Sequence, residues 1–126
     1  MTIDEWIDFY VPMVNREYGL SDKNKQSIAY FKRLKGVARF VCTKSYYIVY
    51  FINPNMWGDK TLSVISFYIR PEVRTFKTFR KVWSIINGIA QKKKVKYIEA
   101  GSHLNSKFNE FLLSDGFHIT TLRKEI

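Results

Sequence analysis

Apolar residues recur at helical spacing in the first third of the chain and at strand spacing in the middle. Thr2 and Glu5 form a capping box that predicts a helix start, and Pro12 predicts a kink or break near Val11. Gly19 predicts the end of this helical region. The apolar face of the first helix consists of Trp6, Phe9, Tyr10 and Met13.

A second helix is expected to begin at Ser21 or Asp22 and to end at Gly36, with Ile28, Phe31 and Leu34 facing inward. The pattern then changes to β-branched and aromatic residues. Segments 37–43 and 46–52 are separated by a short Thr-Lys-Ser corner and predict a hairpin. A polar turn precedes a third strand at 61–70.

An amphipathic helix follows Pro71, and the order after it alternates between strands and helices. Its apolar face is formed by Phe76, Phe79, Val82, Trp83, Ile86, Ile89 and Ala90. A strand at 95–100, a helix at 105–114 and a last strand at 117–122 complete the order. We therefore predict an α/β fold, a single domain over residues 1–126. Its mixed sheet has antiparallel hairpin strands and then parallel strands, with helices on both faces.

Charge is distributed unevenly along the chain. The net charge is +10, but residues 1–20 carry −3, so the remainder carries +13. A body of this charge attracts anions, which include nucleic acid, phosphorylated cofactors and acidic protein surfaces. The alternative to anion binding is a basic surface that only keeps the protein in solution.

Cysteine, histidine and apolar content exclude several classes. One cysteine, Cys42, rules out a disulfide framework and indicates a reducing, cytoplasmic setting. No Cys/His cluster has metal-ligand spacing, so no metal is assigned. No apolar run approaches the roughly 20 residues of a membrane span, and we expect no membrane association.

The residues 69–74, Ile-Arg-Pro-Glu-Val-Arg, resemble the strand, proline turn and arginine of the GCN5-related N-acetyltransferase signature. Asn105, Phe108, Phe111 and the Gly116–Phe117 pair resemble that family's fourth helix and its closing Gly-Phe. The resemblance covers residue 37 to the C-terminus, and the two early helices also fit. It implies a GNAT-like fold, acetyl-CoA as acyl donor, and direct transfer of an acetyl group to an amine.

The resemblance also assigns site residues. The strand end at Phe67 and Ile69 would bind the pantetheine arm, and Arg74 would hold the pyrophosphate. The residues after Arg74 offer charged or hydroxyl groups to phosphate: Thr75, Lys77, Thr78 and Arg80. Asn105 belongs to the same cofactor-binding set.

This chain departs from the family where the phosphate loop has its two glycines, which fall at Lys77 and Phe79. The tyrosine that usually acts as general acid aligns with Leu112. Replacement candidates for the catalytic group are Tyr68, Glu99 and His103; histidine titrates nearest to neutral pH. The alternatives without a catalytic role are a loop or helix-entry histidine for His103 and a surface carboxylate paired with a lysine for Glu99.

Three functions remain open. The first is an N-acetyltransferase whose acceptor is an amine on an acidic protein or a small amine. The second is a non-catalytic binding or structural protein of the same fold; the short Lys/Asn/Ile/Tyr-rich chain looks like small phage-encoded versions, which would place it in the host cytoplasm or a virion. The third, less favoured, is nucleic-acid binding through the lysine run 92–96 and Lys44 with Tyr46, Tyr47 and Tyr50. Strand alternation places Tyr46 and Tyr50 on one side and Tyr47 on the other.

Overall fold

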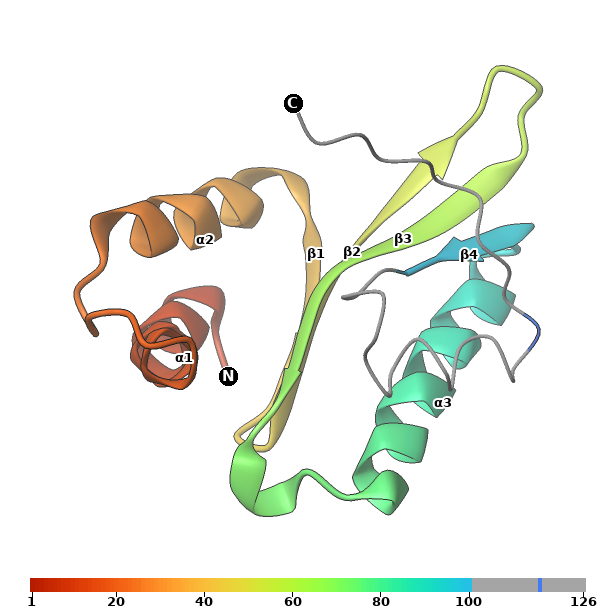
Figure 1. The fold of residues 1–126 in the computed structure, drawn as a ribbon. Helices are drawn as coiled ribbons and strands as arrows, with labels where there is room; N and C mark the ends of the chain where they lie inside the picture. Colours follow the sequence, from red (N-terminus) through yellow and green to blue (C-terminus); the bar gives the residue numbers. More distant parts are fainter. Residues whose placement is uncertain (101–115, 117–126) are drawn as a thin grey trace, which may run out of the picture.

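The computed structural model describes residues 1–100 and 116. A four-stranded mixed sheet lies between two helices on one face and one helix on the other (Figure 1). The strands are β1 (Arg39–Cys42), β2 (Tyr46–Pro54), β3 (Lys60–Ile69) and β4 (Tyr97–Glu99), in that spatial order. β1, β2 and β3 pair antiparallel, and β4 pairs parallel to β3. The predicted mixed sheet with helices on both faces is confirmed.

The first helix, α1 (Ile3–Glu17), is capped as the sequence predicts: the Thr2 hydroxyl accepts from the Glu5 amide at 3.2 Å. Of the kink or break predicted near Val11, the break is wrong, because α1 continues through Pro12. Proline leaves the carbonyl of Asp8 without its helical donor, and Asp8 is exposed, so water can take the donor's place.

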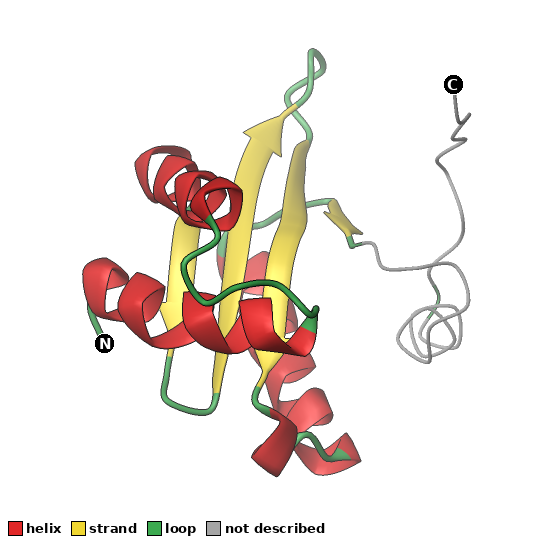
Figure 2. Cartoon of the chain, turned by 60° about the vertical axis from the view of Figure 1, so that its left-hand side comes forward, coloured by secondary structure: helices red, strands yellow, loops and turns green. Residues whose placement is uncertain are grey.

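The second helix, α2 (Lys25–Val37), begins later than predicted. Asn24 is its cap and accepts from the Ser27 amide at 3.0 Å, so neither Ser21 nor Asp22 starts the helix. α2 passes Gly36 and ends with the Ala38 amide bonded to the Leu34 carbonyl. Figure 2 shows α1 and α2 lying together across one face of the sheet.

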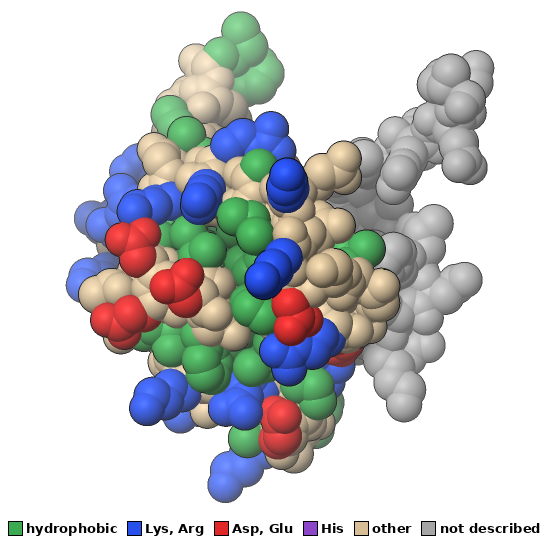
Figure 3. Space-filling view, turned by 90° about the vertical axis from the view of Figure 1, so that its left-hand side faces the viewer, with side chains coloured by type: hydrophobic (Ala, Val, Ile, Leu, Met, Phe, Trp, Pro, Cys, Tyr) green, Lys and Arg blue, Asp and Glu red, His purple; other side chains and the backbone are tan. Residues whose placement is uncertain are grey.

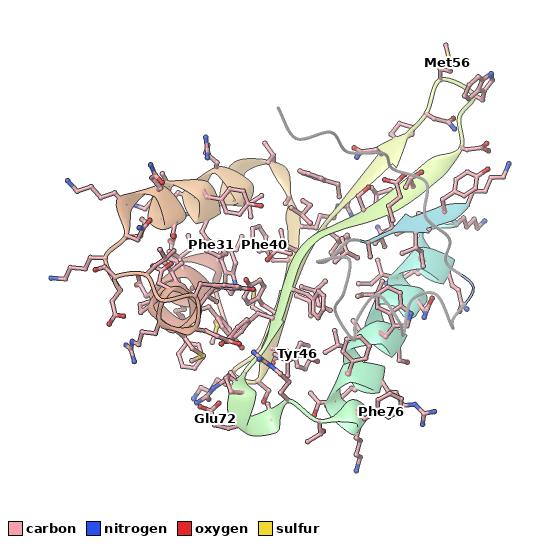
Figure 4. All side chains as sticks on the ribbon, in the orientation of Figure 1. Phe31, Phe40, Tyr46, Met56, Glu72 and Phe76 are labelled. Carbon is pink, nitrogen blue, oxygen red and sulfur yellow. The ribbon has the colours of Figure 1, made fainter. Side chains whose placement is uncertain are left out.

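The hairpin between β1 and β2 closes tightly at its predicted corner. The Thr43 amide donates to the Tyr46 carbonyl at 2.9 Å, and the Thr43 hydroxyl accepts from the Tyr46 amide at 3.1 Å. At the other end of β2 a longer turn joins it to β3 and carries Met56 and Trp57 into solvent (Figure 4). Asn55 holds this turn by accepting from the amides of Trp57 and Asp59.

The sheet separates two apolar clusters. The cluster under α1 and α2 is aromatic, and Trp6 is its centre, with ring contacts of 4.8–5.2 Å to Phe31, Phe40 and Tyr47. Figure 4 shows Phe31 and Phe40 in the space between α2 and the sheet. The cluster under α3 (Phe76–Lys92) is mainly aliphatic, and its most buried members include Ile48, Leu62 and Ile86.

The three tyrosines of β2 belong to these clusters. Tyr46 and Tyr50 lie on the α3 side and Tyr47 lies on the α1 side, as strand alternation predicts. All three are buried, so they cannot stack on the bases of a nucleic acid. The aromatic half of the nucleic-acid hypothesis is therefore wrong.

The C-terminal part of the predicted order lies outside the described residues. This includes the helix at 105–114, the strand at 117–122, His103 and Asn105. Within the described part, the helices are all too short or too polar to cross a membrane. No group of three His, Cys, Asp or Glu side chains gathers there as metal ligands.

Candidate active site

The candidate site is built on β3, the strand between the hairpin and the parallel strand β4. Its pairing with β2 shifts register: Val49 is opposite Ser66, but Tyr50 is opposite Val64. Ile65 is therefore an extra residue, a β-bulge. Because of the bulge, Ile65 and Ser66 both face α1, and the apolar residues toward α3 change from Leu62 and Val64 to Phe67 and Ile69. Bulges of this kind re-aim backbone groups and are common beside active sites.

β4 follows β3 only over a short distance. Three residues pair, Thr61 to Ser63 with Tyr97 to Glu99, and the described ladder ends there. The Arg70 amide donates to the Ser45 carbonyl at 3.0 Å, and antiparallel alternation then turns the backbone groups of Phe67 and Ile69 away from β2. The two residues predicted to bind a pantetheine arm thus present their backbone toward the β4 side of the sheet.

The turn after β3 leads into α3 through a short 3₁₀ segment, Pro71–Val73. Thr75 caps α3, and its hydroxyl accepts from the Thr78 amide at 3.2 Å. The Phe79 amide donates to the Thr75 carbonyl at 3.0 Å. The Lys77 amide donates to no acceptor in the described part of the chain, so it points out of the helix end toward any ligand there.

Arg74 is not free at this turn. Its guanidinium forms two bonds with the Glu17 carboxylate, Nη1 to Oε1 at 2.6 Å and Nη2 to Oε2 at 3.1 Å. It also donates to the Ile69 carbonyl from Nε at 3.1 Å and from Nη2 at 2.8 Å. The residue predicted to hold pyrophosphate is thus already paired with a carboxylate of the same chain, and it holds the end of β3 in place.

Tyr68 completes this cluster. Its hydroxyl donates to Glu17, and the Arg74 guanidinium lies 5.3 Å from its ring centre. Burial first, and then the Glu17 bond, raise the pKa of Tyr68. The hydrogen bond from Arg74 lowers the pKa of Glu17. Tyr68 therefore holds its proton toward Glu17, which makes it a weak proton donor to any other group.

Lys77, Arg80 and Glu99 are the other predicted site residues in the described chain, and Phe79 lies beside the first two in the sequence as a predicted core residue. Lys77 and Arg80 are exposed on the first turns of α3, and the Arg80 guanidinium lies 5.0 Å from the Phe76 ring centre. Phe79 packs against Phe67 in the core with ring centres 6.2 Å apart, as its place in the apolar stripe predicts. Glu99 accepts from the Ser63 hydroxyl at 3.3 Å, and no lysine of the described residues pairs with it.

Tyr68 and Glu99 are not brought together. Ser63, the partner of Glu99, precedes Tyr68 by five residues of strand, which is about 16 Å along β3. The bulge at Ile65 lies between them. The structure therefore places the predicted catalytic groups of the described chain at the two ends of a strand segment whose centre is the bulge.

Three groups at this site were not predicted from the sequence: Glu17, the Ile65 bulge, and the hydrogen-bonded hydroxyls of Tyr47 and Ser66, 3.1 Å apart. The bulge has a readable signal, because the inward apolar positions change from even to odd numbers within one strand. Glu17 has none, since 57 residues separate it from Arg74.

Solved structures share this arrangement of strands and helices. A ribosomal-protein-alanine N-acetyltransferase from Brucella melitensis biovar Abortus 2308 superposes with a TM-score of 0.72 at 8% identity, over 100% of this chain and 95% of that one. An aminoglycoside acetyltransferase from an uncultured soil metagenomic sample superposes with a TM-score of 0.68 at 9% identity, over 100% and 93% of the two chains. The chain has the fold of the GCN5-related N-acetyltransferases.

The superposed region covers nearly all of both compared structures. Its sequence matches no protein-family model and no curated protein. In this GNAT fold β3 and the start of α3 are the elements that the resemblance had assigned to the cofactor.

Proposed function

We propose that this protein is an acyl-CoA-dependent N-acetyltransferase that transfers an acetyl group directly to an amine. The observation that carries the proposal is the bulged strand β3, which runs through a short turn into a helix whose Lys77 amide has no acceptor among the described residues. A strand edge suits an extended amide-containing arm, and an open helix amide suits a phosphate.

Lys77 is the residue that best fits donor binding. Its backbone amide and its exposed ammonium lie at the same helix end, so one residue offers both a hydrogen bond and a charge to a phosphate. The hydroxyls of Thr75 and Thr78 are 3.1 Å apart and flank this amide. Phe79 fits poorly, because its amide is used inside the helix and its ring is part of the core.

The remaining donor contacts would come from β3. Acetyl-CoA would supply an activated thioester, and the chain would bind and orient it along the edge at Phe67. A backbone amide of β3 near the Ile65 bulge would donate to the thioester oxygen, which gains negative charge as the amine adds. The acceptor amine must lose a proton during this addition, and the leaving thiolate must gain one.

The described residues offer no side chain that is clearly available for proton transfer. Tyr68 is held by Glu17, and Glu99 is held by Ser63, so each already has a partner. We assign the base to His103, which follows β4 by four residues in the sequence, because histidine is the residue type whose unperturbed pKa lies closest to neutral pH. The acceptor is an amine, either on an acidic protein or free.

Calorimetric titration with acetyl-CoA tests the proposal. We expect micromolar binding to the native protein and at least tenfold weaker binding to Lys77→Glu. Lys25→Glu is the matched control, because it makes the same charge change at an exposed position of α2, on the other face of the sheet. Release of free thiol from acetyl-CoA with a panel of amines then tests transfer. Absence of binding at millimolar acetyl-CoA would refute the proposal.

The second candidate is a binding protein that keeps the fold without the reaction. Two observations favour it: Arg74 is tied to Glu17, and Phe79 occupies a place where the family has glycine. The same titration separates the two candidates. A binding protein without the reaction would release no thiol with any amine, even where acetyl-CoA binds.

A further inference from the structure

The solvent face of α3 and its continuation toward β4 carry positive charge, most of which no carboxylate of the described residues neutralises. Between Glu72 and Glu99 the sequence has eight Lys and Arg residues and no Asp or Glu. Two of the eight are neutralised, Arg74 by Glu17 and Lys96 by Asp59. The other six form no ion pair with a described carboxylate: Lys77, Arg80, Lys81, Lys92, Lys93 and Lys94.

Four of these cations, Lys77, Arg80, Lys81 and Lys92, lie along one face of α3, and Lys93 and Lys94 follow directly after its C-terminal end. At 100° per residue, positions 77, 81, 84, 88 and 92 share one helical face, and from Lys77 to Lys92 the helix rises about 22 Å. The exposed positions of this face are Lys77, Arg80, Lys81, Ser84, Gly88, Gln91 and Lys92. Basic residues occur at both ends, and small or polar residues lie between them.

The opposite side of the molecule differs. Figure 3 looks onto the layer of α1 and α2 and shows acidic and basic side chains interspersed there. Asp4 pairs with Lys35 at 2.6 Å, and Asp22 with Arg16 at 2.8 Å. A general solubilising charge would resemble this mixed face. The face of α3 is of one sign.

We propose that the solvent face of α3 is a docking surface for the sugar-phosphate backbone of a nucleic acid. A protein partner would need an apolar centre on the surface, because protein interfaces are built around buried apolar or aromatic anchors. The α3 face has no exposed apolar side chain between Lys77 and Lys92. Ser and Gln next to Lys and Arg are the residue types that contact phosphate and sugar.

This surface is separate from the donor site for most of its length. Lys77 and Arg80, in the first turns of the helix, belong to both, and Lys92 and Lys93 lie at the other end of the helix. The tyrosines of β2 take no part, because they are buried. Binding therefore depends on charge and on hydrogen bonds to the backbone, and we expect it to be independent of base sequence.

Fluorescence anisotropy with a labelled 20-nucleotide oligothymidylate and a labelled 20-base-pair duplex tests the inference between 50 and 200 mM salt. The triple variant Lys81→Gln, Lys92→Gln, Lys93→Gln removes two cations from this face and one directly after its C-terminal end, and it leaves Lys77 in place. For the single strand we expect the slope of log K against log salt to fall by about 2, since each contact contributes about 0.7. Affinity at 50 mM salt should fall at least tenfold.

The matched control is Lys25→Gln, Lys32→Gln, Arg33→Gln, which removes the same charge from exposed positions of α2. It should keep most of the affinity. Equal loss in both triple variants would overturn the inference, because net charge alone would then explain binding. So would binding of polyglutamate as tight as that of the oligonucleotide, which would indicate an acidic protein partner, or no binding at 50 mM salt.

Circular dichroism tests whether both variants are folded, and acetyl-CoA titration of the same samples separates this inference from the proposed activity. Loss of oligonucleotide binding with acetyl-CoA binding intact places the nucleic-acid surface on α3 without touching the donor site. Failure of acetyl-CoA binding in the native protein leaves the nucleic-acid test unaffected.

Discussion

Glu17 and Arg74 form a two-bonded ion pair that joins the last turn of α1 to the turn between β3 and α3. The same guanidinium donates twice to the Ile69 carbonyl, and the same carboxylate accepts from Tyr68. The pair therefore links a helix on one face of the sheet to the loop that begins the helix on the other face. Several properties of the protein depend on this link.

The pair should contribute modestly to stability. The two side chains are 32% and 45% exposed, so solvent screens much of their attraction. We expect Glu17→Gln to lower the free energy of unfolding by about 1 kcal/mol, measured by urea denaturation. Asp22→Asn breaks the more exposed pair with Arg16 and is the control. It should cause no measurable change, and an equal loss in both variants would contradict the role assigned to Glu17.

The contribution of Glu17 should depend on pH. Arg74 lowers its pKa in the folded protein below the ordinary 4.5, so the folded state binds fewer protons than the unfolded state in this range. The stabilisation is present above pH 4.5 and is lost as the pH falls through the lower, folded pKa. Urea denaturation of native protein and Glu17→Gln at pH 6, 5, 4 and 3 should give a difference that shrinks toward acid. A constant difference would contradict this.

Removing Glu17 should strengthen the binding of acetyl-CoA, although it lowers the stability of the fold. If Arg74 can turn to a phosphate once its carboxylate is gone, Glu17→Ala binds acetyl-CoA about three- to tenfold more tightly while being less stable. Calorimetry at neutral pH measures the change. Unchanged affinity would show that the bonds to Ile69 keep Arg74 in place and that Lys77 binds the donor without it.

Restoring a glycine at position 79 should not restore a phosphate loop. Phe79→Gly removes a ring from the core and places glycine in a helix, so we expect a loss of about 3 kcal/mol in unfolding free energy. Acetyl-CoA affinity should not rise, because the amide at 79 still bonds to Thr75. Phe76→Gly is the control, at a ring that is 64% exposed, and should cost much less. Tighter binding in Phe79→Gly would contradict this account.

Local signals in the sequence predicted much of the fold. The cap at Thr2, the hairpin corner at Thr43 and the apolar face of α3 each depend on residues a few positions apart. Each is confirmed, except that Phe76 of the predicted face is exposed. The start of α2 was harder to predict, because several polar residues close together can each cap a helix. Asn24, rather than Ser21 or Asp22, is the cap, because its side chain accepts from the Ser27 amide.

The site was harder to predict because it depends on contacts between distant parts of the chain. Arg74 lies where the resemblance places it, but its partner is a carboxylate from the first helix. Nothing in the sequence near either residue indicates that the two pair. Pro12 shows the same limit. Its local effect favours a break, and the packing of α1 against the sheet through Trp6 and Tyr10 keeps the helix continuous.

The division of the interior by the sheet gives the protein three built-in fluorescent reporters. Trp6 is fully buried among the rings under α1 and α2, Trp83 is buried in the aliphatic cluster under α3, and Trp57 is 80% exposed at the hairpin tip. Single-tryptophan versions would therefore follow each side of the sheet separately, and the third would report on whatever approaches the tip.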